Sequence, residues 1–158
     1  MCNIKSVIEL DYIPNEYIEI LSNWFYNWWG KNESWSYEKV YNYVKNSTSK
    51  KSIPKTFIYV EDGILKGVCM VSFHDADVRP DIYPWLINVY VDKPYRLQGI
   101  GKTLISYAID YLSKNNYKEV YVYTLIKTLY EKFNFKKIDE IKTFDDDLTY
   151  DLLKLEIA

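Results

Sequence analysis

Apolar residues recur along the chain with the periods of strands and helices, and this pattern predicts the order of the elements. Residues 4–10 alternate loosely between apolar and polar and predict a first strand. Helical spacing of apolar residues over 15–30, and again over 37–44, predicts two helices. Either Ser34 or Ser36 can cap the second of them. The chain is therefore expected to begin with a strand and two helices.

The middle of the chain is predicted to hold a hairpin, a loop and a buried strand. β-Branched and aromatic residues predict strands over 56–60 and 64–73, and Asp62-Gly63 is typical of the hairpin turn between them. Residues 74–84 are polar and contain two prolines, which predicts a loop. Residues 86–91 are almost continuously apolar, which predicts a strand covered on both faces.

The last third of the chain continues the mixture of helices and strands. Apolar positions over 104–112 form the clearest amphipathic helix in the sequence. A strand is predicted over 120–124, a short helix over 128–133, and two strands near 136–144 and 148–157. Since no internal repeat or linker interrupts this order, the sequence predicts a single mixed α/β domain.

Length and composition agree with one soluble domain. The chain has 158 residues, of which 48% are hydrophobic and 27% charged, the balance of a globular protein. We expect one domain over residues 1–158. The formal net charge is −2, with 20 basic residues against 22 acidic ones. Because nucleic-acid binders usually carry a basic excess, nucleic acids and anionic membranes are disfavoured as partners.

Cysteine and histidine are scarce, which argues against disulfide and metal chemistry. Cys2 and Cys69 give no disulfide framework, and Cys69 is expected to be a buried packing residue in a strand. With His74 as the single histidine, the sequence predicts no metal site. Residues 1–9 lack the apolar core of a signal peptide, and no apolar run approaches the ~18 residues of a membrane span. We therefore expect a cytoplasmic protein.

The most informative segment is a glycine-bearing turn within residues 89–103. A buried strand is predicted to enter the turn and an amphipathic helix to leave it. The N-terminus of a helix presents unpaired N–H groups and a partial positive charge, so this junction suits a phosphate. Gly99 and Gly101 let the backbone approach an anion closely. Arg96 and Lys102 add positive charge at the two ends of the turn.

Three phosphate-binding motifs compete for this turn. The P-loop pattern ends in G-K-[ST], which residues 101–103 match, but its first glycine would fall on Arg96. The dinucleotide pattern G-x-G-x-x-G can begin at Gly99 and fails at Leu104, where its third glycine belongs. The pattern R-x-x-G-x-G fits completely, from Arg96 to Gly101.

That hexapeptide resembles the acetyl-CoA signature of the GNAT superfamily of acyl-CoA N-acyltransferases. Residues Pro84–Val91 resemble the strand that precedes the signature in a bacterial branch, and Leu129–Phe135 resembles the family's L-Y-E-K-x-G-F segment. Ile53–Phe57 and Ser72–Asp75 are similar to the same branch. Asn134 stands where the family usually has glycine, and asparagine can still close a helix in the left-handed conformation.

The resemblance implies a fold and an activity. It implies a single, central, mostly antiparallel sheet of about six to seven strands with splayed central strands, flanked by about four helices. The splayed strands would be residues 86–91 and 120–124, and the pantetheine arm of acetyl-CoA would pair with their backbone between them. The implied reaction is N-acetyl transfer from acetyl-CoA to a primary amine, by direct attack in a ternary complex and without a metal.

The resemblance also assigns cofactor contacts residue by residue. These contacts are Val89, Tyr90, Val91, Arg96, Leu97, Gln98, Gly99, Ile100, Gly101, Lys102, Thr103, Thr124 and Tyr130. An N–H near Val89 would polarise the thioester carbonyl. Tyr130 would be the general acid to the CoA thiolate, because phenol and thiol have neighbouring reference pKa values of ~10 and ~8.5.

The acceptor side is less determined by the sequence. His74 and Asp77 are candidate bases, and a water relay is an alternative. Glu33 is a candidate contact of the acceptor. An acidic rim suited to a cationic amine, such as an aminoglycoside, a polyamine or a peptide N-terminus, would consist of Glu33, Asp75, Asp77 and Asp81.

Four tryptophans fall in and after the first predicted helix. Trp24 and Trp28 recur at helical spacing and are predicted to lie in the core. Trp29 and Trp35 do not follow this spacing and could line an aromatic acceptor pocket, with Trp29 as the candidate contact.

Two other functions stay open at this stage. A non-catalytic acyl-CoA-binding or regulatory domain of the same fold would keep the glycine turn and lack a working acceptor site. An RNA-binding module that uses the aromatic residues would need a basic face. The expected partner is therefore a small-molecule or peptide amine, with no nucleic acid and no membrane, and the protein would be a monomer or a homodimer.

Overall fold

The structure is a computed structural model in which residues 5–75, 79–142 and 148–157 are described. The strands are β1 (Lys5–Leu10), β2 (Lys55–Glu61), β3 (Ile64–Ser72), β4 (Trp85–Val91), β5 (Glu119–Thr124), β6 (Lys136–Lys142) and β7 (Thr149–Glu156). The helices are α1 (Asn15–Phe25), α2 (Tyr37–Lys45), α3 (Ile100–Lys114) and α4 (Lys127–Glu131), with a π-helical turn η1 (Tyr26–Gly30) and a 3-10 turn η2 (Lys93–Tyr95). The order of elements is the one that the hydrophobic pattern predicts.

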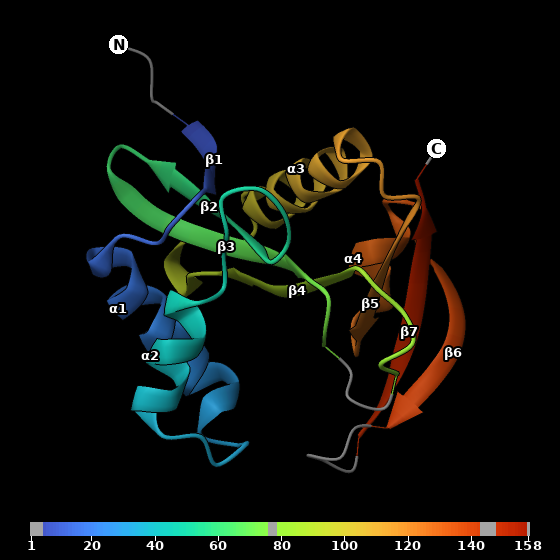
Figure 1. Ribbon diagram of the computed structural model, residues 1–158, viewed down its shortest axis with the longest axis horizontal. Coiled ribbons are helices and arrows are strands. Elements are labelled where there is room, and N and C mark those ends of the chain that lie inside the picture. The colour runs from blue at the N-terminus through green and yellow to red at the C-terminus, as the bar shows by residue number, and fades with distance from the viewer. Residues whose placement is uncertain (1–4, 76–78, 143–147, 158) are drawn as a thin grey trace.

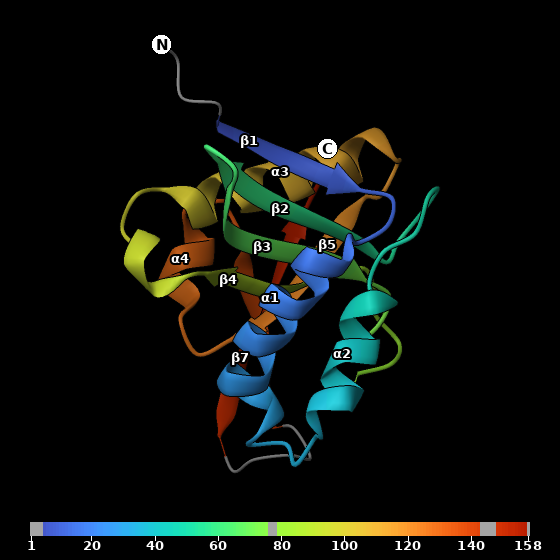
Figure 2. The ribbon, with the colours of Figure 1, turned by 90° about the vertical axis from the view of Figure 1, so that its left-hand side faces the viewer.

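One seven-stranded sheet forms the centre of the molecule, in the order β1-β2-β3-β4-β5-β7-β6 (Figure 1). Each neighbouring pair is antiparallel except β4 and β5, which are parallel. Helices α1 and α2 cover one face, whereas α3 and α4 lie on the other (Figures 1 and 2). This confirms the mixed, mostly antiparallel α/β fold that the resemblance implies.

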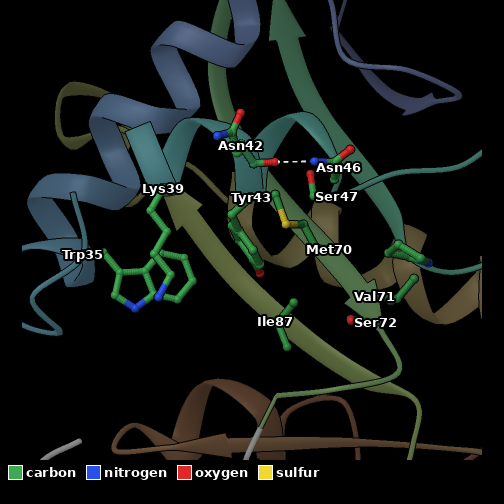
Figure 3. A pocket seen from close by; sticks show the side chains of 11 residues that line it. Trp35, Lys39, Asn42, Tyr43, Asn46, Ser47, Met70, Val71, Ser72 and Ile87 are labelled. Carbon is green, nitrogen blue, oxygen red and sulfur yellow. Dashed lines mark hydrogen bonds between the residues drawn. The ribbon is translucent and has the colours of Figure 1, made fainter. Parts of the chain in front are cut away.

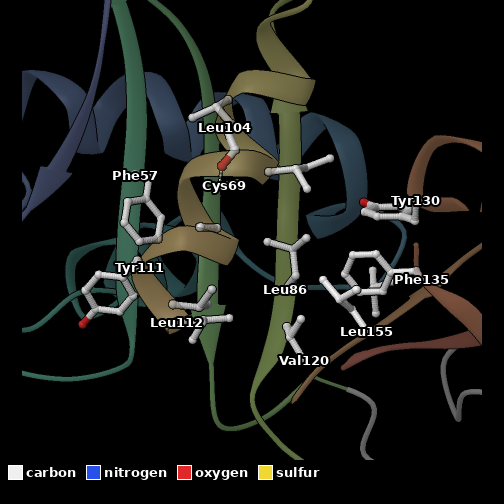
Figure 4. Close-up of a cluster of buried hydrophobic side chains, with 14 of the residues drawn as sticks. Phe57, Cys69, Leu86, Leu104, Tyr111, Leu112, Val120, Tyr130, Phe135 and Leu155 are labelled. Atoms are coloured by element: carbon white, nitrogen blue, oxygen red, sulfur yellow. Dashed lines mark hydrogen bonds between the residues drawn. The ribbon is translucent and has the colours of Figure 1, made fainter. Parts of the chain in front are cut away.

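An apolar core lies on each face of the sheet, because side chains along a strand point alternately to its two faces. Leu86 points into the core beneath α3, together with Leu104 and Leu155 (Figure 4). Its neighbours Trp85 and Ile87 point into the core beneath α1 and α2. Strand β4 therefore contributes to both cores and separates them.

Strands β4 and β5 meet only at their beginnings. The register pair between these described strands is Trp85 with Tyr121, and the Tyr121 N–H donates to the Pro84 carbonyl at 2.9 Å. Beyond this point the strands part (Figure 1). The prediction that 86–91 is covered on both faces is confirmed, because Val89 packs against the core beneath α3 and Tyr90 against the core beneath α1 and α2. Asn88 to Val91 are nevertheless only half-buried, because β5 no longer pairs with β4 along that edge.

Several details of the helices differ from the sequence predictions, and one decides between two predicted caps. Trp28 is 43% exposed instead of lying in the core, because the buried face of α1 ends with Phe25. Helix α4 ends at Glu131, earlier than predicted, and Asn134 follows in the left-handed conformation with a φ of 72°. Ser36 caps α2, its hydroxyl accepting a backbone N–H. In the described ranges, no helix combines the length and the apolar character needed to cross a bilayer.

Helix α3 approaches β3 closely at Gly67. A Cβ added to Gly67 would lie 3.0 Å from both Ile100 Cγ2 and Leu104 Cδ1, and 3.2 Å from the Tyr90 carbonyl oxygen. Glycine is therefore what lets the first turn of α3 rest against the sheet. Because α3 begins at Ile100, this contact also fixes where the N-terminus of the helix lies relative to β4.

Replacing Gly67 with valine should lower the free energy of unfolding by about 1–3 kcal/mol, the usual cost of overpacking a core. Urea unfolding followed by circular dichroism measures the effect. The control is Ile64→Val on the same strand, where the side chain is exposed and the change should stay below about 0.5 kcal/mol. An unchanged unfolding midpoint for Gly67→Val would show that α3 has room to spare and contradict this description.

Candidate active site

The glycine turn leads from β4 into α3 through a defined series of backbone conformations. The Asp92 carboxylate accepts the N–H of Lys93 at 3.0 Å and caps η2. Arg96 then returns to extended backbone, Leu97 has a φ of 66° and Gly99 a φ of 82°. The left-handed region suits glycine and strains leucine. Alternation of this kind turns successive N–H groups toward one side of a turn.

A run of backbone N–H groups in this turn has no partner among the described residues. The N–H groups from Leu97 to Lys102 form no hydrogen bond with any residue that the structure describes. The first helical bond runs from the Thr103 N–H to the Gly99 carbonyl at 3.1 Å. Unpaired N–H groups at a helix N-terminus, together with the helix dipole, form a binding site for an anion. A phosphate group is the ligand that fits this chemistry.

Two cationic side chains flank the run of N–H groups. Arg96 Nε donates to the Val91 carbonyl at 2.8 Å, and the guanidinium carbon lies 5.3 Å from the centre of the Tyr90 ring. These contacts hold the guanidinium beside the turn. Lys102 is exposed on the first turn of α3. The structure thus places both cations at the turn, as the sequence predicts.

The other residues of the turn have different roles. Leu97 and Gln98 are exposed, whereas the side chain of Ile100 is buried beneath α3. The Thr103 hydroxyl donates to a carbonyl of the turn at 3.0 Å and is therefore used inside the helix. A Cβ added to Gly101 would make only an ordinary contact of 3.8 Å with the protein. The space over Gly101 is therefore open toward a ligand.

A β-bulge interrupts β4 where it parts from β5. The register with β3 passes from Ile87 to Tyr90, which leaves Asn88 and Val89 without a partner in the described ladders. Asn88 has a φ of 51°, which asparagine tolerates, and its Nδ2 donates to the Tyr43 hydroxyl at 2.9 Å. The bulge therefore leaves the Val89 main chain available beside the parting.

The direction of the main chain after the bulge follows from one hydrogen bond. The Asp92 N–H donates to the Lys66 carbonyl on the β3 side at 2.9 Å. Because hydrogen-bonding direction alternates along a strand, the main chain of Val91 and Val89 faces the parted side. Tyr90 lies between them, with its backbone paired to β3 and its ring packed against two tryptophans of α1 and η1.

Tyr130 lies on α4 at the other edge of the parting. The residue is 7% exposed, and its ring meets the edge of Phe135 at 5.7 Å between centres. Its hydroxyl points toward β4 in Figure 4. Burial raises the pKa of the phenol, with smaller contributions from Cys69 and Asp75. The phenol is therefore neutral near pH 7 and can donate a hydrogen bond.

Two further residues near Tyr130 are engaged within the protein. Thr124 ends β5, and its hydroxyl oxygen accepts the N–H of Ile126 at 2.9 Å. Cys69 is fully buried, and its thiol donates to the Leu104 carbonyl at 3.5 Å. Burial raises the pKa of this thiol, which keeps it protonated. The prediction that Cys69 is a packing residue is confirmed.

A cavity of about 340 Å³ opens on the opposite face of the sheet, between α2 and strands β3 and β4 (Figure 3). Its lining includes Trp35, Lys39, Tyr43, Met70, Ser72 and Ile87. Through its hydrogen bond with Asn88, Tyr43 connects this cavity to the bulge of β4. Burial raises the pKa of Tyr43, and the charges of Asp75 and Glu33 raise it further. The negative charges of two carboxylates therefore influence this tyrosine of the cavity wall.

The residues of the predicted acidic rim interact with different groups in the structure. The charges of Asp75 and Glu33 raise the pKa of Tyr43, which lines the cavity, but neither residue is part of the lining. Asp81 instead accepts two hydrogen bonds from Arg79 on the surface, at 3.0 and 3.1 Å. Its charge is therefore already paired with that of Arg79. The candidate base Asp77 lies outside the described residues.

The other predicted residues of the acceptor side lie around the cavity. His74 is exposed just after β3. Its backbone N–H donates at 3.3 Å to the hydroxyl of Ser72, which lines the cavity. Trp29 stands behind the cavity, with its ring 5.1 Å from Trp35 and 5.6 Å from Tyr43. Its indole N–H is buried without a partner in the described structure. Trp29 therefore supports the wall that Trp35 and Tyr43 present.

Sequence reasoning missed three residues of this region: Tyr43, Asn88 and Lys39. The one available signal was Asn88, a polar residue that tolerates left-handed backbone, inside an otherwise apolar strand. Tyr43 and Lys39 gave no signal, because their place beside β4 depends on how α2 packs.

The sequence matches a known protein family. A model of the acetyltransferase (GNAT) family matches residues 16–135. Among curated proteins, none matches the chain.

Solved structures share the fold over nearly the whole chain. An N-acetyltransferase from Staphylococcus aureus Mu50 has a TM-score of 0.72 at 15% identity, covering 97% of this chain and 99% of that one. An aminoglycoside 6'-N-acetyltransferase complexed with coenzyme A has a TM-score of 0.79 at 13% identity, covering 97% of each chain. An aminoglycoside 6'-acetyltransferase type Ii has a TM-score of 0.76 at 15% identity, again covering 97% of each. At these identities the likeness shows the fold.

The buried phenol of Tyr130 gives stability a definite pH dependence. The pKa of Tyr130 is raised in the folded protein above the ~10 of an unfolded chain. As the pH rises, the unfolded chain therefore loses this proton before the folded protein does. The resulting stabilisation is complete below pH ~10 and is lost as the pH rises further. In urea titrations, Tyr130→Phe should flatten the fall of unfolding free energy above pH ~10 by up to about 1.4 kcal/mol per pH unit.

Phe135→Leu is the matched control, because it disturbs the packing of Tyr130 without removing a titrating group. It should lower stability equally at every pH. If Tyr130→Phe kept the slope of the unaltered protein, the phenol would have to ionise equally in both states, against its burial.

Proposed function

The chain belongs to the GNAT acetyltransferase family, and from this premise we propose that it moves the acetyl group of acetyl-CoA to a primary amine. The observation that carries the proposal is the run of N–H groups from Leu97 to Lys102, which form no hydrogen bond with any described residue. Acetyl-CoA supplies an activated thioester and a diphosphate that needs such donors. The open space over Gly101 and the charges of Arg96 and Lys102 fit that diphosphate.

The main chain of β4 is the proposed guide for the pantetheine arm. Val89 and Val91 turn their backbone groups to the parted side, where β5 does not pair with them. The Val91 carbonyl already accepts from Arg96 Nε, so the proposed contacts of the arm are the Val89 main chain and the Val91 N–H. Buried amide groups need partners, and the amides of the arm can supply them. The Val89 N–H, freed by the bulge, is the proposed donor to the thioester carbonyl oxygen.

The reaction we propose is direct attack within a ternary complex. The amine nitrogen forms a bond to the acetyl carbon, the carbon–sulfur bond breaks, and the nitrogen releases a proton. The proposed role of Val89 and of the diphosphate site is to position the reacting groups, which can supply much of the acceleration. None of these roles requires a metal.

Tyr130 is the proposed partner of the leaving thiolate. Its neutral phenol, directed toward β4, can donate to the sulfur. Complete proton transfer from a phenol of pKa ~10 to a thiolate of pKa ~8.5 is uphill by about 2 kcal/mol, and a raised phenol pKa adds to this. The hydrogen bond itself therefore supplies most of the stabilisation.

The amine is proposed to enter from the face with the α2 cavity. The negative charges of Glu33 and Asp75, which raise the pKa of Tyr43, are the proposed source of attraction for an ammonium on that side. Its protons leave through His74, Asp77, one of these two carboxylates or a water relay. Two of the similar structures are aminoglycoside acetyltransferases, so an aminoglycoside, a polyamine and a peptide N-terminus are the acceptor classes to compare.

The proposed setting follows from the same features. With a net charge of −2, we propose no nucleic-acid or membrane partner. We propose a single domain over residues 1–158 that works in the cytoplasm as a monomer or homodimer.

Calorimetric titration with acetyl-CoA, NAD and ATP tests the cofactor class, and Gly101→Val tests the site. Acetyl-CoA should bind more tightly than the other two. The valine side chain should hold the diphosphate away from the N–H groups and weaken acetyl-CoA binding by at least about tenfold. The unfolding midpoint of the variant should be unchanged, because the protein leaves room at this position. Equal affinity of variant and unaltered protein would place the diphosphate elsewhere.

Tyr130→Phe separates turnover from binding. Losing a hydrogen bond to a developing charge, worth about 1.5–3 kcal/mol, should lower kcat about ten- to a hundredfold while the KM for acetyl-CoA stays the same. Release of CoA thiol measures both quantities. Tyr111→Phe, another buried tyrosine on the α3 side, is the control and should leave kcat unchanged. Parallel losses in kcat and affinity would argue against the proposed role.

A different outcome would identify a different function. If acetyl-CoA binds tightly but no amine in a broad panel releases thiol, the chain is a non-catalytic acyl-CoA-binding domain of this fold.

A further inference from the structure

The cavity beside α2 has a chemistry that selects among amines. Its wall combines the rings of Trp35 and Tyr43 with the apolar side chains of Met70 and Ile87 (Figure 3). The two rings meet edge to face at 5.8 Å. At about 340 Å³ the cavity is at the small end of ligand pockets, which span roughly 300–1,000 Å³. Asn42, Asn46, Ser47 and Ser72 add polar groups to the lining. A large hydroxyl-rich molecule would nevertheless find little room here.

A cationic side chain already lies in this wall. Lys39 lines the cavity, and its Nζ lies 4.1 Å from the centre of the Trp35 ring (Figure 3). Its backbone N–H donates to the hydroxyl of the helix cap Ser36 at 3.1 Å, which places Lys39 in the first turn of α2. Any second positive charge of a ligand in the cavity would therefore meet an ammonium of the same sign.

Negative charge, in contrast, acts on Tyr43. Asp75 and Glu33 both act on this residue, which lies deeper along α2 and is hydrogen-bonded to Asn88 on β4. An amine held there is next to the strand that is proposed to guide the thioester. One ammonium is thus favoured near Tyr43, and an additional ammonium is repelled near Lys39.

We propose, on the basis of the acetyl transfer inferred above, that the acceptor is a monoamine on an aromatic or other apolar body and that Lys39 excludes polycations. The apolar body packs on Trp35, Met70 and Ile87, and the single amine faces Tyr43 and β4. The two aminoglycoside acetyltransferases share the fold of this chain, but their named substrate class does not suit this cavity.

An acceptor panel tests this inference in the full chain. 2-Phenylethylamine and tryptamine represent aromatic monoamines, and spermidine and kanamycin represent polycations. With acetyl-CoA, thiol release should give a kcat/KM at least about tenfold higher for the monoamines. In Lys39→Glu, which exchanges a positive for a negative charge, this preference should shrink by about tenfold or reverse. Lys39→Met, which removes only the charge, should give an intermediate ratio.

Lys45→Glu is the matched control, because Lys45 is exposed on the last turn of the same helix and does not line the cavity. It should keep the preference of the unaltered protein. A preference for spermidine or kanamycin, or a Lys39→Glu ratio equal to that of the control, would overturn this inference and leave the acetyl transfer intact.

Direct binding separates this inference from the proposed reaction. Titration of the CoA-bound protein with 2-phenylethylamine and with spermidine should show tighter binding of the former. This result without any thiol release would support the cavity chemistry and contradict the proposed reaction. Tighter binding of spermidine would contradict the cavity chemistry whether or not turnover occurs.

Discussion

Strands β4 and β5 pair at Trp85 and Tyr121 and then part, and the backbone beyond that point must find its hydrogen bonds elsewhere. In most sheets such a gap would be closed by the next strand or by side chains. Here a bulge at Asn88 and Val89 lies beside it, and the turn after β4 adds another run of N–H groups without partners in the described structure. Only residues 92–96 separate these two stretches in sequence. The site follows from their combined need for a ligand with amides and phosphates.

The sheet also separates the proposed sites of the two substrates. Because side chains of β4 alternate, Val89 faces the α3 side, whereas Tyr90 faces the α1 side. The turn and Tyr130 lie with α3 and α4, and the cavity lies with α2. The gap between β4 and β5 is the proposed route from one face to the other. Asn88 and Tyr43 join the acceptor cavity to this strand through a single hydrogen bond.

The sequence allowed prediction of whatever depends on local chemistry. Helix and strand periods identified the elements, and the glycine pattern identified the turn at 96–101 because left-handed backbone is encoded by the residues themselves. What it could not reveal depends on distant packing. The hydrogen bond between Tyr43 and Asn88 joins residues from different elements. The half-exposure of β4 depends on the path of β5, and the exposure of Trp28 depends on where the core beneath α1 ends.

Backbone amide resonances test the central claim most directly, because the claim concerns individual N–H groups. In a ¹⁵N-labelled sample titrated with coenzyme A, the amides from Leu97 to Lys102 and that of Val89 should shift together and become protected from hydrogen exchange. Inorganic pyrophosphate alone should reproduce the shifts in the turn and leave Val89 unaffected. Resonances of the turn that stay in place at saturating coenzyme A would contradict the account.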